Sequence, residues 1–318
     1  MFRRVLCIVL ASVLILQPSN ALAWSEGAHH VIGLIAFDAM TPAAQKLLLE
    51  ILKAHPKFAT DFKTDLTEPK AIGHFMLGTA AYWPDVARDY PEFNRPKWHY
   101  QLGASLVIGN PPKVPVTPGA LFKGSTLETQ DLHITQAIEL CRQTLTGSAP
   151  DSDKAVAICW LAHLVGDAHQ PCHAGSLYAD GIFPGPTGDR GANSIPTKQR
   201  RNLHALWDGL LGTSGKPNDV ARRAFDVRQD KAAMSEAEAA AANLEPSQWL
   251  AESIEASKRY VYTPDVLAAV EAAARSGATK VETVDLSEAY LKDAGAVAHR
   301  RVAVAGLRLG NLLSEDLK

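Results

Sequence analysis

The densest group of residues that could do chemistry lies over residues 163–173, which are rich in histidine and aspartate. His163 and Asp167 are four positions apart, which places them on one face of a helix. Residues 153–169 are apolar nearly all round, which indicates a buried helix. A buried carboxylate without a partner costs several kcal/mol or more. A cation from outside the sequence is the simplest partner for Asp167, although a hydrogen bond between the two side chains beside a second helix would also explain the pair.

A second group repeats this spacing, because His204 and Asp208 are again four positions apart. Between the two pairs, Pro171 ends the first helix and turns His173 in a new direction. One such pair is often only a surface contact, but two pairs and a further histidine are much less common by chance. Zinc binds histidine nitrogen and aspartate oxygen, and its catalytic sites keep one position open for water. The sequence therefore predicts a catalytic zinc site.

Two weaker candidates lie upstream. Residues 82–88 place Asp85 and Arg88 beside a turn that Pro84 predicts, and His99 stands between two aromatic residues. Each has an alternative interpretation from sequence alone. Asp85 could cap a helix, and His99 could be a histidine of the core.

The start of the chain reads as a secretory signal peptide over residues 1–23, with a basic start, an apolar stretch over residues 5–16 and small residues before the exit. Its apolar run is too short to span a bilayer. Cleavage would leave Trp24 as the first residue, five positions before His29. A free terminal amine can bind zinc and an amide nitrogen cannot, so the cleavage site and the metal ligands belong together. We expect an exported protein, periplasmic or secreted, with no membrane insertion after cleavage.

The remaining 318 − 23 = 295 residues suit one large domain over residues 24–318, since no linker or repeat interrupts them. The formal charge of −2 becomes −4 when Arg3 and Arg4 are removed. A protein that binds duplex DNA through a broad basic face usually has a more positive net charge than this chain. Any chemistry on nucleic acids must therefore depend on a local site.

Helical patterns dominate the rest of the chain, and we expect a mainly α fold. The predicted helices cover residues 29–40, 43–54, 132–145, 153–169, 232–242, 265–275 and 286–313, the last with interruptions at Gly295 and Gly306. Thr41-Pro42 is a typical helix start before the second of these. One short strand is predicted over residues 106–108. Residues 103–124 and 174–202 look irregular, and the second stretch is long enough to be functional rather than a simple connection.

Three cysteines follow the predicted leader: Cys141, Cys159 and Cys172. An odd number does not describe a disulfide scaffold. One disulfide with one thiol, or three thiols, are both compatible with the sequence.

The chain resembles the S1/P1 nuclease family in three features of its sequence. These are the motif His163-x3-Asp167-x5-His173, the later motif His204-x3-Asp208, and a tryptophan at the predicted mature terminus. The resemblance implies a single compact multi-helix domain of the type shared by zinc-dependent phospholipase C and P1 nuclease. It also implies three Zn²⁺ ions. The implied ligands are Asp85, His99, His163 and Asp167 for the first ion, Trp24, His29 and the bridging Asp167 for the second, and His173, His204 and Asp208 for the third.

The resemblance further implies a phosphodiesterase that hydrolyses single-stranded DNA and RNA to 5′-mononucleotides through attack by a zinc-bound hydroxide, and it leaves removal of 3′-phosphates open. Asp85 would orient the attacking water, and Arg88 would bind phosphate. Tyr100 would stack on a nucleobase, and Asn193, in the polar loop of residues 174–202, would contact the substrate. No stable protein partner is implied, and we expect a monomer.

Two other functions compete with this interpretation. Zinc-dependent phospholipase C shares the architecture, but it uses glutamate where this chain has Asp208, and no apolar stripe for membrane docking is evident. The second alternative is a zinc-binding protein without catalytic activity. In such a protein the open coordination position would have no use, which disfavours this alternative.

Overall fold

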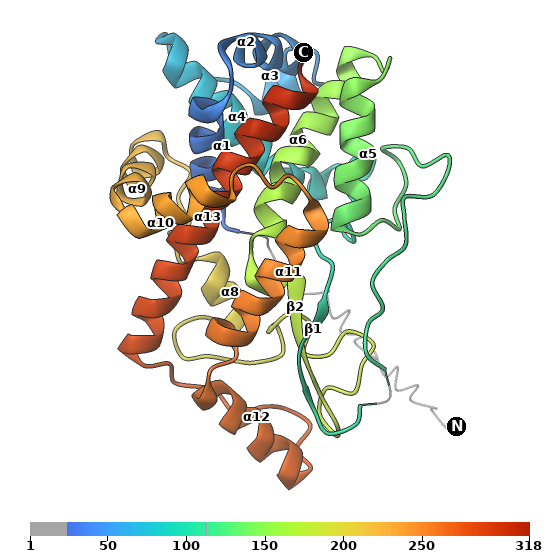
Figure 1. Ribbon diagram of the computed structural model, residues 1–318, viewed down its shortest axis with the longest axis vertical. Helices are drawn as coiled ribbons and strands as arrows, with labels where there is room; N and C mark the ends of the chain where they lie inside the picture. The colour runs from blue at the N-terminus through green and yellow to red at the C-terminus, as the bar shows by residue number, and fades with distance from the viewer. Residues whose placement is uncertain (1–23, 112) are drawn as a thin grey trace, which may run out of the picture.

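Helices form most of the structure, a computed structural model that describes residues 24–111 and 113–318. The predicted leader lies outside these residues. The α-helices are α1 (Glu26–Ala39), α2 (Pro42–Leu52), α3 (Phe58–Asp61), α4 (Pro69–Val86), α5 (Ile134–Thr146), α6 (Asp151–Ala168), α7 (Pro171–Ala174), α8 (Leu203–Asp208), α9 (Pro217–Gln229), α10 (Lys231–Ala240), α11 (Pro246–Ala256), α12 (Pro264–Ser276) and α13 (Glu288–Asp316). A 3₁₀ turn, η1 (Ala87–Asp89), and a π turn, η2 (Ser257–Val261), extend α4 and α11. The mainly α class is confirmed (Figure 1).

The centre of the fold is α6, which is buried at every position from Ala155 to Ala168. It packs against α4 and α5, while α1 packs against α4 and α13 (Figure 1). The prediction of a buried helix is thereby confirmed. Its burial explains why a sequence with little amphipathic pattern still folds as a helix, since apolar neighbours surround it on all sides.

Helix starts follow the local chemistry of the sequence. Pro42 occupies the first turn of α2, and the Thr41 hydroxyl accepts a hydrogen bond from the Ala44 amide at 3.3 Å. This capping satisfies one of the amides that the first turn leaves without a helical partner. The predicted helix start at Thr41-Pro42 is confirmed.

The predicted turn at Pro84 is wrong. Pro84 lies inside α4, which continues to Val86 and then into η1. A proline inside a helix removes one backbone hydrogen bond, but here it falls within the last turn, where little of the helix remains to be broken. Asp85 is consequently a helical residue and Arg88 lies in the 3₁₀ turn that follows.

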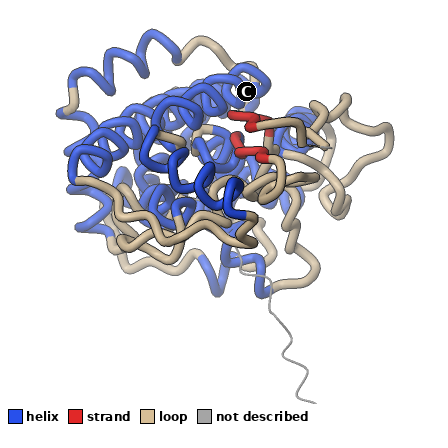
Figure 2. The backbone as a smooth tube through the Cα atoms, turned by 90° about the horizontal axis from the view of Figure 1, so that it is seen from below, coloured by secondary structure: helices blue, strands red, loops and turns tan. Residues whose placement is uncertain are grey.

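Two segments predicted to be irregular contain strands that pair with each other, and the first of these strands includes the one predicted over residues 106–108. β1 (Gly103–Ile108) and β2 (Gly175–Ala179) run parallel, with Gly103 opposite Gly175. Figure 2 shows both strands together at one side of the helices, beside the long loops. Because His99 comes shortly before β1 and His173 shortly before β2, this pairing brings the two histidines together. The Gln101 amide donates to the His173 carbonyl at 3.0 Å.

Cys141, Cys159 and Cys172 are buried free thiols, so the three-thiol alternative describes the structure. Burial raises the pKa of the Cys141 thiol.

Among the residues that the structure describes, none of the helices has the length and apolarity that crossing a bilayer requires.

The predicted interruptions of the last helix are also wrong, because α13 is continuous through Gly295 and Gly306. Gly306 is a point of close contact between helices. A Cβ placed on it would lie 2.7 Å from the Cβ of Ile35 on α1. At Gly295, by contrast, an added Cβ would meet no atom within 4 Å.

This difference predicts opposite effects of one substitution at two positions of the same helix. Gly306→Ala should lower the free energy of unfolding by about 1–3 kcal/mol, because α1 and α13 must move apart. Gly295→Ala should raise it by about 0.5–1 kcal/mol, since alanine restricts the unfolded chain and nothing obstructs its methyl group. Denaturant unfolding of both variants would measure the difference. Equal effects would contradict the close packing of α1 on α13.

Candidate metal centre

Six segments deliver histidine and aspartate side chains to one buried region. Their positions were all singled out from the sequence, and all of them are buried: His29 on α1, Asp85 on α4, His99 before β1, His163 and Asp167 on α6, His173 on α7, and His204 and Asp208 on α8. Helices α6 and α8 place their two residues four positions apart, on one face. The remaining positions become neighbours only through the packing of the fold.

The side chains form three groups within which the candidate ligand atoms lie no more than 4.8 Å apart. The groups are His29, His163 and Asp167; Asp85, His99 and His163; and His173, His204 and Asp208. The first two groups share His163 and form one continuous cluster, which we call the paired cluster. The third group, which we call the α7–α8 group, lies beside it.

Asp167 presents its two oxygens to different parts of the paired cluster. Its Oδ1 lies 3.5 Å from His29 Nε2, whereas its Oδ2 lies 3.1 Å from His163 Nε2 and 3.3 Å from His99 Nδ1. A carboxylate arranged in this way can serve two cations, one through each oxygen. The geometry therefore suits a bridging ligand between two metal ions.

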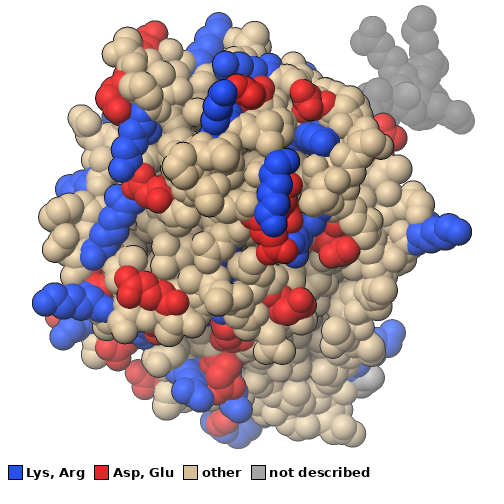
Figure 3. Space-filling view, turned by 45° about the horizontal axis from the view of Figure 1, so that its top comes forward, with Lys and Arg blue, Asp and Glu red and all other residues tan. Residues whose placement is uncertain are grey.

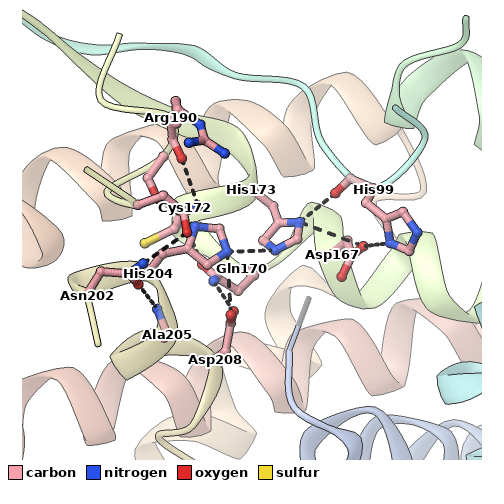
Figure 4. A network of polar contacts seen from close by, with 12 residues as sticks. His99, Asp167, Gln170, Cys172, His173, Arg190, Asn202, His204, Ala205 and Asp208 are labelled. Atoms are coloured by element: carbon pink, nitrogen blue, oxygen red, sulfur yellow. Dashed lines mark hydrogen bonds and ion pairs between the residues drawn. The ribbon is translucent and has the colours of Figure 1, made fainter. Parts of the chain in front are cut away.

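The α7–α8 group contains two nitrogen lone pairs that face each other. His173 Nδ1 lies 2.5 Å from the His99 carbonyl, and His204 Nδ1 lies 2.6 Å from the Gly191 carbonyl. A carbonyl oxygen only accepts, so both Nδ1 atoms carry the proton and both Nε2 atoms carry a lone pair. These Nε2 atoms are 3.1 Å apart (Figure 4). Two lone pairs at this distance repel unless a cation lies between them, and metal-binding histidines are oriented by just such carbonyl contacts.

The same residues account for many of the buried polar atoms that lack a hydrogen-bond partner in the described part of the chain. They include both ring nitrogens of His29, Nε2 of His99, Oδ2 of Asp85 and Oδ1 of Asp167. Buried polar atoms are nearly always hydrogen-bonded, and an exception calls for an explanation such as an ion. The donor set of imidazole nitrogens and carboxylate oxygens fits zinc.

Burial sets the charge state of these groups. It lowers the pKa of His163 to about 4 and that of His99 and His173 well below the usual range. It raises the pKa of Asp167 to about 7 and that of Asp208 well above its usual range. The imidazoles of His99, His163 and His173 are thus neutral and able to donate their lone pairs, and a nearby cation would favour the charged form of the two carboxylates.

Gly166 provides the space for His29. A Cβ at this position would lie 2.9 Å from Cε1 and 3.0 Å from Nδ1 of the His29 ring. The ring therefore rests directly on the backbone of α6, and it stacks on His163 with ring centroids 4.2 Å apart. The absence of a side chain at Gly166 lets α1 and α6 bring their ligands together.

Arg88 lies against Asp85 in this structure. Its Nε donates to Asp85 Oδ1 at 2.9 Å and its Nη2 lies 2.8 Å from the same oxygen. This leaves Asp85 Oδ2, the oxygen without a hydrogen-bond partner, for another ligand. Arg88 thus orients Asp85.

Trp24 and Ser25 join the beginning of α1 to α8. Trp24 is fully buried, the Ser25 amide donates to the Asp208 carbonyl at 3.0 Å, and the Ser25 hydroxyl donates to the Gly212 carbonyl at 2.6 Å. The first described residues are therefore fixed against the helix that carries His204 and Asp208.

The two residues predicted to contact substrate lie near the metal groups but not among them. Tyr100 follows His99 and is half-buried. Asn193 lies in the loop between β2 and α8, where its Nδ2 donates to the Arg190 carbonyl at 3.0 Å and its Oδ1 accepts from Asn202 Nδ2 at 3.2 Å. Asn202 in turn caps α8 by accepting from the Ala205 amide.

Sequence reasoning missed the role of Gln170. This residue is fully buried and its Nε2 donates to Asp208 Oδ1 at 2.7 Å. Its position inside the histidine-rich segment was the available signal, since a buried amide needs partners for both of its ends.

Comparison with known proteins gives relatives that carry the name endonuclease. Over 216 residues the chain is 27% identical to Endonuclease 4 of Arabidopsis thaliana, a match that covers 63% of this chain and 60% of the relative. It is 25% identical to Endonuclease 3 of the same plant over 216 residues, covering 64% of the chain and 60% of the relative. The chain thus spans about 60% of the length of these relatives. The sequence profile described as S1/P1 Nuclease matches residues 24–318, and the chain belongs to the S1/P1 nuclease family.

Proposed function

We propose that this protein is a zinc-dependent phosphodiesterase that hydrolyses single-stranded DNA and RNA to 5′-mononucleotides. The observation that carries the proposal is the buried Asp167, whose two oxygens face separate sets of histidine nitrogens. Family membership and the endonuclease names of the relatives support the same reaction class. Removal of 3′-phosphates would use the same groups and belongs to the proposal as a second activity.

Three zinc ions would be held by the groups described above. Asp85, His99, His163 and Asp167 would hold the first, His29 and Asp167 together with the amine and carbonyl of Trp24 the second, and His173, His204 and Asp208 the third. Zinc ions held there would make water a nucleophile at neutral pH and offset negative charge on phosphate oxygens.

The protein's own side chains would orient the reactants. Asp85, held by Arg88 through Oδ1, would accept a hydrogen bond from the attacking water. The Arg88 side chain is 15% exposed, whereas that of Asp85 is 1% exposed. The Arg88 guanidinium would therefore contact a phosphate oxygen. A charged hydrogen-bond donor aimed at developing negative charge favours the transition state over the ground state.

Binding of single strands would depend on Tyr100 and on the loop between β2 and α8. Tyr100, half-buried beside His99, offers a ring on which an unpaired base can stack, worth about 1–3 kcal/mol per base. Arg190, Arg200 and Arg201 of the loop are exposed, whereas Lys198 pairs with Asp285 at 2.8 Å. The face shown in Figure 3 mixes basic and acidic side chains. The three exposed loop arginines are our candidates for contacts with a nucleic-acid backbone.

Export is part of the proposal, because the second zinc set needs a free amine. Residues 1–23 would be a signal peptide, and cleavage would release the Trp24 amine in the periplasm or outside the cell. The contact between Ser25 and the Asp208 carbonyl would hold this new terminus near the ligands.

Replacing the bridging carboxylate should remove more metal than replacing a ligand of one ion. Asp167→Asn keeps the shape of the side chain and removes its charge, so we expect zinc to fall from about three ions to about one per chain, with turnover nearly abolished. His204→Ala should lose about one ion. Elemental analysis of both purified variants would test this. Equal zinc content in the two variants would contradict the bridge.

The amino terminus should be essential for zinc binding and turnover. An added methionine before Trp24 converts the amine into an amide, which cannot act as a ligand, so the extended protein should bind zinc more weakly and hydrolyse single-stranded DNA much more slowly. The matched control carries a protease site before Trp24, and cleavage there should restore both properties. Native zinc content and rate in an extended protein of verified mass would refute the proposed role of Trp24.

Substrate choice should separate a nuclease from a phospholipase of the same architecture. We expect single-stranded DNA and RNA to be hydrolysed well ahead of duplex DNA, with a KM that rises with salt, and little action on phosphatidylcholine. Tyr100→Ala should raise KM for single strands by an amount equivalent to about 1–3 kcal/mol, with zinc content unchanged. Faster turnover of phosphatidylcholine than of any oligonucleotide, at equal zinc occupancy, would favour the phospholipase.

A further inference from the structure

Gln170 occupies the corner between α6 and α7 and uses both ends of its side-chain amide. Its Nε2 donates to Asp208 Oδ1 at 2.7 Å, and its Oε1 accepts a hydrogen bond from the Cys172 amide, which caps α7 (Figure 4). The side chain is fully buried. One residue thereby links the helix that carries His173 to the helix that carries Asp208.

The contact with Asp208 decides how many oxygens that carboxylate can offer. Oδ1 is occupied by the Gln170 amide, while Oδ2 lies 3.5 Å from His204 Nε2 and is on the side of the histidines. A carboxylate without this contact could turn both oxygens toward one ion. With it, one lone pair of Oδ1 is used and Oδ2 is held toward the histidines, which disfavours binding of one ion through both oxygens.

The contact with α7 fixes the direction of His173. The Gln170 carbonyl accepts from the His173 amide at 3.0 Å, in addition to the side-chain cap on the Cys172 amide. Because α7 has only four residues, its own hydrogen bonds hold it weakly, and short helices depend on their caps and contacts.

The corner itself cannot shift easily, because buried groups from α11 and α13 hold its backbone. Ser253 Oγ donates to the Ala168 carbonyl at 2.6 Å, Arg301 Nε donates to the His169 carbonyl at 3.2 Å, and Arg308 Nη1 lies 3.0 Å from His169 Nε2. Glu252 accepts from both arginines. The backbone next to Gln170 is therefore held by buried hydrogen bonds, and a side chain that orients a metal ligand needs such a fixed backbone.

We propose that Gln170 is a positioning residue that restricts Asp208 to one metal-binding oxygen and so keeps a coordination position open on the ion of the α7–α8 group. The inference rests on the proposed function, in which that position receives a phosphate oxygen. Three protein ligands and an open position are typical of catalytic zinc, whereas a fourth protein donor closes the site.

Two substitutions separate the two contacts of Gln170. Gln170→Asn keeps a side-chain oxygen that can cap α7, since asparagine is a preferred cap, but it is one methylene too short to reach Asp208. Gln170→Met removes both contacts at nearly constant volume. Gln136→Met is the matched control. Gln136 is also buried, its Oε1 accepts from the His133 amide at 3.1 Å to cap α5, and its Nε2 donates to the Gly119 carbonyl at 3.1 Å, with no metal ligand involved.

Metal binding is measured by competition with a chelator, and coordination by the visible spectrum of the cobalt-substituted proteins. In both Gln170 variants we expect one ion, which we assign to the α7–α8 group, to bind about 10–100-fold less tightly, with the other two ions unaffected. The Co²⁺ proteins should absorb less per bound ion, because a second Asp208 oxygen raises the coordination number. Gln136→Met should match the native protein in both measurements.

Three results would overturn the inference. A Gln170→Asn protein with native affinity and spectrum would show that the cap alone matters or that neither contact does. Weaker binding of the ion of the α7–α8 group with an unchanged cobalt spectrum would show that Asp208 binds this ion through one oxygen even without Gln170. A native protein that binds fewer than three ions would remove the basis of both proposals, whereas the first two results leave the proposed function intact.

Discussion

The charge of Asp167 is the constraint on which the rest of the site depends. This carboxylate is fully buried on a helix whose neighbours are apolar, and burial raises its pKa to about 7. Histidines whose own pKa values are depressed cannot supply a compensating positive charge. A buried ionised carboxylate is stable only with a cation at short range, and the two oxygens of Asp167 face two sets of neutral nitrogens. Such a set of donors is suited to divalent cations.

The fold brings these donors together by packing rather than by sequence proximity. Helix α6 supplies His163 and Asp167, and Gly166 lets α1 press His29 against them. The pairing of β1 with β2 does the same for His99 and His173, whose carbonyl and ring are hydrogen-bonded to each other. That contact joins the paired cluster to the α7–α8 group, so movement of one ligand disturbs the other. If metal ions are bound as proposed, such sharing would make the loss of metal and of local structure cooperative.

The sequence was sufficient for the parts of this structure that depend on local spacing. The pairs four residues apart, the buried helix around Asp167 and the cap at Thr41 all follow from helical geometry. Predictions failed where tertiary packing overrides local preference. Gly306 lies within a continuous helix, where its lack of a side chain leaves space for Ile35 of α1. The prediction at Pro84 failed for a local reason, because this residue falls in the last turn of α4. The strand β2 and the double contact of Gln170 depend on partners far away in the sequence, which no local pattern reveals.

The overall negative charge of the chain is compatible with a polyanionic substrate if the site is considered by itself. Three carboxylates belong to the metal groups, namely Asp85, Asp167 and Asp208. Three divalent ions would carry six positive charges, so the occupied site would keep an excess of about three, with Arg88 adding to it. Exposed charges farther away than roughly 8–10 Å are largely screened at physiological salt, so acidic groups elsewhere on the surface weigh little against it. A phosphodiester would therefore be attracted by the metal centre and the nearby loop arginines, and a broad basic face is unnecessary.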